Sequence, residues 1–292
     1  SDNFIIVDLT NGERVIGETD FTSGPSVLHE KAIYIVEGQL YQVERLDFDG
    51  RKAFVRAVEC DYYTDAIDYT KVTILDEMTG SSETTSEVVS VEPSETTSEV
   101  VSGAASPVAH HGEVHVVSRV VGFKKIKFYT NENIGSGELD LPEQQMHTSS
   151  YWLTVPRETM DALPHGIADR RDGVLGLAFA MRNVAPLLLM CDSHDLGLSV
   201  DGVTTDEAAR TAGTVEPTIF IYDNYPGGIG FSEPLHSMHS DLVAKTRELI
   251  DGCPCRSGCP SCVGPEGNTG PLAKTVASHL LRLLSPSEMQ SA

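Results

Sequence analysis

The sequence lacks an apolar run long enough to span a bilayer, and its start has no basic segment followed by a hydrophobic stretch. We therefore expect no membrane partner and no signal peptide. An initiator methionine is also lacking, which suggests a piece cut from a longer polypeptide. The 292 residues suffice for one large domain or two modest domains, each with its own hydrophobic core.

Basic residues are scarce, since 21 Lys and Arg face 43 Asp and Glu and give a net charge of −22. Such a surface repels nucleic acid at long range, so we expect the isolated chain to bind DNA poorly. The one dense basic run comprises Arg119, Lys124, Lys125 and Lys127. Lysines on a strand usually protect a sheet edge from aggregation. Contact of Lys124, Lys125 and Lys127 with a phosphate backbone is the functional alternative.

Motifs of catalysis are also missing. The sequence contains no Walker A motif, no DExH box, no metal-protease motif and no recognisable acid–base pair. The segment Cys191-Asp-Ser-His-Asp195 has the residue types of a hydrolase, but triad partners usually converge from separate segments. We therefore predict no catalytic residue and keep a hydrolase only as the weakest hypothesis.

Four of the six cysteines fall within ten residues, in the spacing C-x-C-x3-C-x2-C. This clustering indicates a metal site rather than the disulfide framework of a secreted protein, and it favours a reducing, cytoplasmic location. Cys60 and Cys191 stand alone and are interpreted as reduced, mostly buried thiols.

The cluster comprises Cys253, Cys255, Cys259 and Cys262. Thiolates are soft ligands, and four of them arranged as a tetrahedron suit one Zn²⁺. No coordination position would stay open, so the ion is predicted to be structural. A disulfide or redox site and an iron–sulfur cluster remain alternatives. His236 and His239 lie one helical turn apart, but the thiolates already complete a zinc shell, so we interpret them as surface histidines.

Residues 1–147 form a β-rich domain in this interpretation, with short alternating runs and hairpin turns at Glu37-Gly38 and Asp49-Gly50. A low-complexity insertion at 79–109 is rich in Ser, Thr, Glu and Val and repeats one octapeptide at 83–90 and 95–102. We expect a mobile loop that joins two strands of one sheet. Residues 133–142 are Gly-rich and are predicted as a loop.

Residues 148–292 show helix–strand alternation and form the second predicted domain. Helices are expected at 157–163, at 172–182, from an N-cap at Ser232 to Ile250, and from Pro271 to Leu284. Buried strands are expected at 187–190 and 218–222. The fold class is therefore α+β: a small, barrel-like antiparallel β unit, then an α/β zinc-binding domain with the four-cysteine knuckle between two helices.

A glycine-rich segment, Asp223-Asn-Tyr-Pro-Gly-Gly-Ile-Gly230, connects the strand at 218–222 to the helix that follows. Such a turn can cradle a phosphate, which would give contacts at Gly227, Gly228 and Gly230. However, no Lys-Ser/Thr follows, so it is not a nucleotide P-loop. A tight turn that needs glycine for packing is the favoured interpretation.

Two segments, 222–234 with the glycine loop and 253–265 with the cysteines, resemble the C-terminal zinc-binding region of MrfA/YprA-type DEAD/DEAH-box helicases of superfamily 2. Shorter similarities lie at 28–34, 61–64, 121–127, 141–143 and 190–192. The resemblance implies zinc on the four cysteines and a parent ATP-dependent 3′-to-5′ DNA helicase in DNA repair or defence. It also implies upstream RecA-like domains of the same polypeptide as partners, with DNA reached through the full enzyme.

Because the motor motifs are missing here, this chain is expected to be a non-catalytic accessory region of that enzyme. It would stabilise the helicase, guide single-stranded DNA or bind a partner protein. A free-standing zinc-binding protein-interaction module is the alternative.

Overall fold

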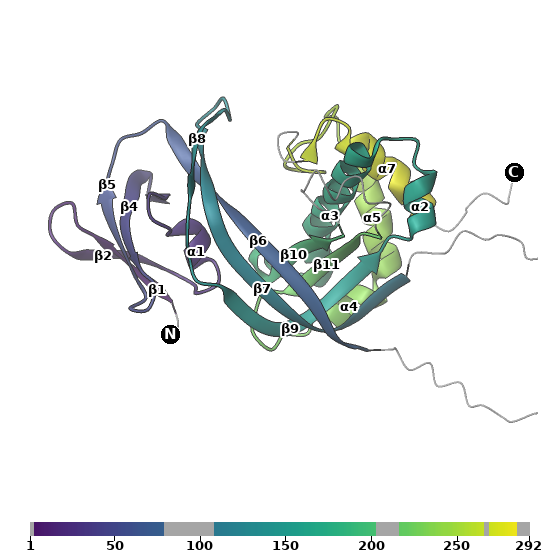
Figure 1. Ribbon diagram of the computed structural model, residues 1–292, viewed down its shortest axis with the longest axis horizontal. Coiled ribbons are helices and arrows are strands. Elements are labelled where there is room, and N and C mark those ends of the chain that lie inside the picture. The colour runs from purple at the N-terminus through teal and green to yellow at the C-terminus, as the bar shows by residue number, and fades with distance from the viewer. Residues whose placement is uncertain (1–2, 79–107, 203–215, 266–268, 285–292) are drawn as a thin grey trace, which may run out of the picture. The chain divides into compact units, whose positions relative to one another are not determined.

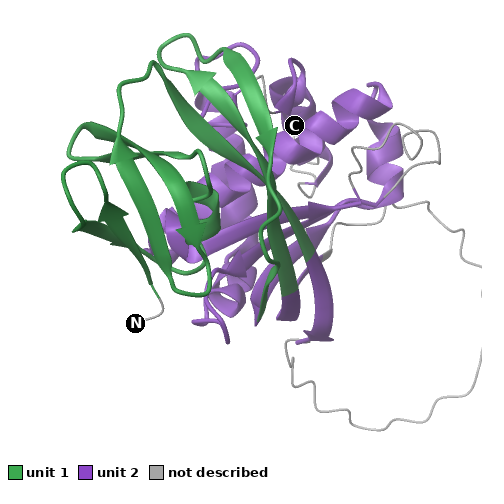
Figure 2. Cartoon of the chain, turned by 60° about the vertical axis from the view of Figure 1, so that its left-hand side comes forward, with its two compact units in different colours: residues 1–71, 116–146 green, residues 72–115, 147–292 purple. Residues whose placement is uncertain are grey.

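The computed structural model describes residues 3–78, 108–202, 216–265 and 269–284. The chain forms two compact units, 1–71 with 116–146 and 72–115 with 147–292 (Figure 2). The strands β6 (Tyr62–Glu77) and β7 (Val108–Lys127) contribute residues to both units. The predicted domain division at residue 147 stays a prediction. The predicted insertion, apart from 108–109, lies outside the described residues.

The first unit contains a five-stranded sheet in the order β2-β1-β5-β4-β3. Its pairs are antiparallel except for β1 with β5, which run parallel. The elements are β1 (Phe4–Asp8), β2 (Arg14–Thr19), α1 (Gly24–Val27), β3 (Ile33–Val36), β4 (Gln39–Asp47) and β5 (Lys52–Ala57).

Both predicted hairpin turns are confirmed. Glu37 and Gly38 join β3 to β4, and their φ angles of 49° and 81° fit the turn type that matches strand twist. The turn from β4 to β5 contains Gly50. Alternate residues of the strands, such as Phe4 with Ile6 and Ala53 with Val55, are buried and form the core of this unit.

The second sheet has the order β10-β11-β9-β7-β6, and β8 pairs with β7 off this path. Its further strands are β8 (Asn133–Glu138), β9 (Gln144–Thr154), β10 (Leu196–Asp201) and β11 (Thr218–Asp223). Since β6 and β7 share this sheet, the predicted insertion does join two strands of one sheet.

The prediction of a loop at 133–142 was wrong over 133–138, which form β8, and only 139–142 lack regular structure. Its glycines permit a close approach to β7: a Cβ on Gly137 would lie 2.5 Å from the ring of Phe123. Glycine here serves packing between strands rather than a flexible turn.

The second unit carries the helices α2 (Arg157–Ala162), α3 (Ile167–Leu189), α4 (Ser232–Ser237), α5 (His239–Gly252) and α7 (Ala273–Leu284), and the 3₁₀ helix η1 (Ser193–Asp195). The predicted strand at 187–190 was wrong: residues 187–189 end α3, and Met190 follows as its left-handed C-cap with a φ of 54°. A short apolar run does not distinguish a strand from the end of a buried helix. Ser232 begins α4 instead of capping it, and α7 begins two residues after Pro271.

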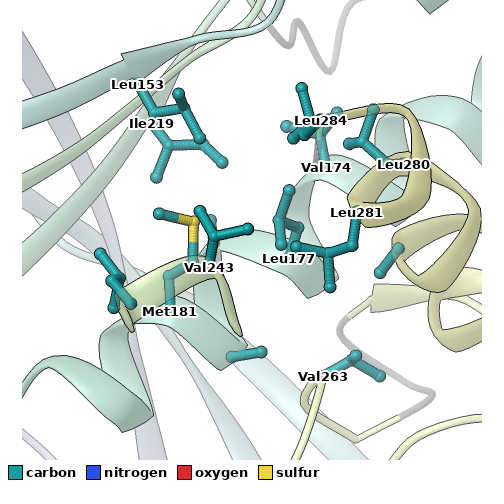
Figure 3. Close-up of a cluster of buried hydrophobic side chains, with 14 of the residues drawn as sticks. Leu153, Val174, Leu177, Met181, Ile219, Val243, Val263, Leu280, Leu281 and Leu284 are labelled. Carbon is teal, nitrogen blue, oxygen red and sulfur yellow. The ribbon is translucent and has the colours of Figure 1, made fainter. Parts of the chain in front are cut away.

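The core of the second unit lies between its strands and its helices (Figure 3). Leu153 of β9 and Ile219 of β11 face Leu177 and Met181 of α3 there, and all four are fully buried. The expectation that no apolar run reaches membrane-spanning length was wrong, because α3 could cross a membrane by length and composition. However, 56% of its most apolar window is buried inside the unit. We interpret it as the central core helix. The predicted α+β class, with the cysteine knuckle between α5 and α7 (Figure 1), is confirmed.

Small residues bring α3 close to α7 and to the segment before it. A Cβ on Gly173 would lie 2.3 Å from Cγ1 of Val276, a distance that real side chains do not tolerate. Glycine at this position therefore sets how closely the two helices pack.

We expect Gly173→Ala to lower the free energy of unfolding by about 1–3 kcal/mol, because overpacking outweighs the better helix propensity of alanine. Denaturant unfolding measures this change. Gly252→Ala is the matched control, since a Cβ there meets no atom within 4 Å. Equal stability of the two variants would contradict the packing argument.

Candidate metal centre

The four predicted cysteine ligands converge. Their sulfur atoms all lie within 4.8 Å of one another. Four of the pairs are 3.4–3.6 Å apart: 253 with 255, 253 with 259, 255 with 262 and 259 with 262. A tetrahedral zinc with Zn–S bonds of about 2.3 Å requires sulfur atoms about 3.8 Å apart. The cluster therefore fits a zinc ion, and it is the only such group among the described residues.

The local backbone positions these sulfurs. Cys253 follows α5 directly as its C-cap. The carbonyl of Cys259 accepts hydrogen bonds from the N–H groups of Cys262 and Gly264, at 3.0 and 3.1 Å, which closes the turn. Gly258 is required here, because its φ is 155° and a Cβ would lie 2.6 Å from the Gly264 carbonyl oxygen.

Lys274 of α7 connects the knuckle to the helix through hydrogen bonds. Its Nζ donates hydrogen bonds to the carbonyls of Cys253 and Cys255, at 2.6 and 2.7 Å, and lies 3.6 Å from the Cys255 sulfur. Sequence reasoning missed this residue, because one lysine among the other polar residues of an amphipathic helix gives no signal of its own. A zinc ion with four thiolates carries a net charge of −2, which the ammonium group offsets in part.

The thiols differ strongly in their acidity. Burial raises the pKa of Cys262 to about 12 and also raises the pKa of Cys255. Burial acts in the same direction on Cys259, but hydrogen bonds from the Ser261 N–H and the other cysteines outweigh it and lower that pKa to about 7. Four ionised sulfurs at this spacing therefore need a divalent cation beside them, which is what zinc supplies.

The other candidate ligands take structural roles. The interpretation of His236 and His239 as surface histidines was wrong: both are half-buried. One ring nitrogen of His236 lies 3.0 Å from the Ala109 carbonyl, and one of His239 lies 2.8 Å from the Tyr151 hydroxyl. Neither belongs to the cysteine cluster.

The segment Cys191–Asp195 does not have the properties of a catalytic site. Burial, together with nearby Asp195, raises the pKa of the Cys191 thiol, whereas a nucleophilic cysteine needs a lowered one. The carboxylates of Asp192 and Asp195 form the capping box of η1. Cys60 is half-buried and its thiol contacts the Tyr62 carbonyl at 3.3 Å.

The backbone amides of the glycine loop bind a carboxylate side chain of the same chain. One carboxylate oxygen of Asp223, which is 1% exposed, accepts hydrogen bonds from the N–H groups of Ile229, Gly230 and Phe231 at 2.7, 2.8 and 3.3 Å. Ser149 donates a fourth at 3.0 Å. This is the arrangement that binds phosphate elsewhere, filled here by a side chain.

The other two glycine amides are also engaged. The Gly227 N–H donates to the His147 carbonyl and the Gly228 N–H to the Tyr225 carbonyl. The φ angles of 84°, 70° and 91° at Gly227, Gly228 and Gly230 explain the need for glycine. Phosphate contact at these residues stays a prediction, and the N–H groups would have to leave their present acceptors to make it.

The basic residues lie in the other unit, on β7. Lys127 pairs with Asp61 at 3.7 Å, and the Lys125 ammonium lies 5.1 Å from the ring centre of Tyr62. Arg119 pairs with Asp140 and donates to the Leu141 carbonyl. Lys124 is half-buried. The predicted nucleic-acid contacts are thus divided between the two units.

Comparison with known proteins identifies the metal centre. The family described as the MrfA Zn-binding domain matches residues 177–263, from the middle of α3 to the end of the cysteine knuckle. The uncharacterized ATP-dependent helicase YprA of Bacillus subtilis is 38% identical over 268 residues, which cover 91% of this chain and 32% of that protein. The ATP-dependent helicase HRQ1 of Saccharomyces cerevisiae is 24% identical and is matched over 90% of this chain and 23% of its own.

Solved structures agree. The crystal structure of the DUF1998 helicase MrfA bound to DNA has a TM-score of 0.54 at 35% identity, covering 98% of this chain and 34% of that one. A further crystal structure of MrfA has a TM-score of 0.59 at 29% identity, covering 97% and 34%. The chain is a zinc-binding region of the MrfA/YprA type of helicase. It spans about a third of the length of YprA and MrfA.

The cofactor of this MrfA-type region is one structural zinc ion, and the cluster of Cys253, Cys255, Cys259 and Cys262 has the geometry to hold it. The assignment of these four residues as its ligands stays a prediction. Four thiolate ligands would close the shell and leave no position for substrate or water.

We expect elemental analysis to find one zinc per chain, and Cys262→Ser to abolish it. Loss of the ion should lower the melting temperature of the second unit by at least about 10 °C, because structural zinc contributes directly to folding. Cys191→Ser is the control, since this thiol lies outside the cluster. Full zinc content in the Cys262 variant would refute the ligand set.

Asp223→Asn should destabilise the chain by about 1–3 kcal/mol, because a charged acceptor of four hydrogen bonds becomes neutral. Chemical denaturation checks the value. The control is Asp201→Asn, whose exposed carboxylate accepts one bond from the Gly202 N–H. If both variants unfold at the wild-type denaturant concentration, the carboxylate does not hold the loop.

Proposed function

We propose that this chain is the non-catalytic, zinc-binding accessory region of an ATP-dependent DNA helicase that acts in DNA repair or defence in the cytoplasm. The observation that carries the proposal is the closed four-thiolate cluster between α5 and α7, in a chain 38% identical to a helicase. A closed shell offers no catalytic position, so the zinc has a structural role. The partners are RecA-like domains of the same polypeptide, and through them DNA.

The stabilising role is supported by how the knuckle connects its surroundings. Cys253 extends α5, Lys274 of α7 donates to two knuckle carbonyls, and Val263 packs on α3. Three helices of one core thus depend on a loop that contains few apolar residues. Without zinc, the loop would have little to hold it.

Guidance of single-stranded DNA is the finer part of the proposal. Lys124, Lys125 and Lys127 on β7 are its candidates, because their charges stand out in an acidic chain. Gly227, Gly228 and Gly230 support it less well, since their N–H groups already have internal acceptors.

A free-standing zinc-binding protein-interaction module is the second candidate. The observation that favours it is the net charge of −22, because an acidic surface suits a basic protein partner better than DNA.

The full-length polypeptide separates the two candidates. We expect Cys262→Ser to reduce ATP-driven DNA unwinding by at least about tenfold and to lower thermal stability, because the accessory region no longer folds on the motor. Cys191→Ser should change neither. Unwinding and stability at wild-type levels in a Cys262→Ser enzyme shown to lack zinc would reject the accessory role in favour of the interaction module.

A further inference from the structure

A cavity of about 280 Å³ lies beside the zinc knuckle in the second unit. It is bounded by the end of α5, by the knuckle and by α7. Its volume is near the lower end of the range of about 300–1,000 Å³ for small-molecule sites, so it suits a phosphate ester better than a large apolar ligand.

Its lining is basic, although the chain is strongly acidic. Arg256, Lys274 and Arg282 contribute three positive charges, and His279 lies among them. The one carboxylate, Asp251, is already engaged by the Ser278 hydroxyl at 2.9 Å and by Arg247 at 3.8 Å. The cavity therefore has a net positive charge in a molecule of net charge −22.

The two arginines are available to a ligand. Within the described part of the chain, neither Arg256 nor Arg282 has an ion-pair partner, and both are exposed. Lys274 differs, because its ammonium is held by the Cys253 and Cys255 carbonyls. It contributes charge, while the guanidinium groups contribute hydrogen-bond donors in the planar geometry that matches a phosphate. The exposed Thr275 hydroxyl adds a further donor to the lining.

The knuckle determines where one of these donors lies. Arg256 stands between Cys255 and Cys259, so its backbone position depends on the metal cluster. Arg282 stands in the last turn of α7, the helix that Lys274 fastens to the same knuckle. A site built from both arginines requires the zinc-bound conformation.

We infer that this cavity binds phosphate groups of a nucleic-acid strand through Arg256 and Arg282. This inference rests on the proposed role in a DNA helicase, and it identifies the residues that would bind the strand. It also gives the structural zinc a second consequence, since the ion positions a phosphate-binding arginine.

The test is fluorescence anisotropy of a labelled oligothymidylate with the zinc-loaded chain at low salt. Arg256→Gln/Arg282→Gln should weaken binding by about tenfold, and the slope of log K against log salt should fall by about 1.4, the value for two strand contacts. The matched control is Lys52→Gln/Lys245→Gln, which removes two charges outside the cavity and should change the affinity less than about twofold. Zinc content and melting temperature of all variants verify that each is folded.

Three results would overturn the inference. In the first, the control variant weakens binding as much as the arginine variant, which would indicate diffuse charge. In the second, the wild-type chain shows no measurable binding of the oligonucleotide. In the third, inorganic phosphate binds to the wild-type chain and loses affinity in the arginine variant, but the oligonucleotide does not bind, which would assign the cavity to free phosphate. Unwinding by the full-length enzyme tests the helicase role by itself. A failure of this inference is therefore distinguishable from a failure of the proposed helicase role.

Discussion

Four sulfur atoms within 4.8 Å of one another are the constraint on which the second unit depends. Burial makes at least two of these thiols hard to ionise, and ionised sulfurs at this spacing repel one another. A divalent cation reverses both effects, because it attracts every thiolate at once. The ten residues of the knuckle bury little apolar surface, so the metal supplies the folding free energy that a hydrophobic core supplies elsewhere.

The consequences extend from the knuckle into the core. Cys262 and Val263 are fully buried, and Val263 contacts the segment of α3 around Gly176, where only a small residue allows the approach. Lys274 adds a second connection, since it lies on α7 and binds the carbonyls of the knuckle. The knuckle, α3 and α7 thus pack together, so the close contact at Gly173 and a zinc ion on the knuckle would stabilise the same core.

Local spacing made the zinc ligands, the two hairpin turns and the helical flanks of the knuckle predictable from the sequence. What could not be predicted depends on contacts through space. The Asp223 carboxylate that occupies the amides of the glycine loop comes from the preceding strand, and no spacing rule distinguishes an internal anion from a bound phosphate. The apolar periodicity of α7 does not single out Lys274, so its contact with the knuckle could not be predicted. The run at 187–190 has the apolar character of a strand, but packing makes it the end of a 23-residue helix.

Net charge and local charge lead to different expectations for nucleic acid. A charge of −22 lowers the rate of encounter with DNA, but salt screens that repulsion beyond a Debye length of about 8–10 Å at ordinary ionic strength. Inside the cavity beside the knuckle, a phosphate would meet Arg256 and Arg282 at hydrogen-bond distance, where screening is weak. In a full helicase the motor domains would hold the strand nearby, so a low rate of encounter with free DNA would matter less. An acidic region with one basic cavity can therefore contact a strand that another domain delivers, while it binds DNA free in solution only weakly.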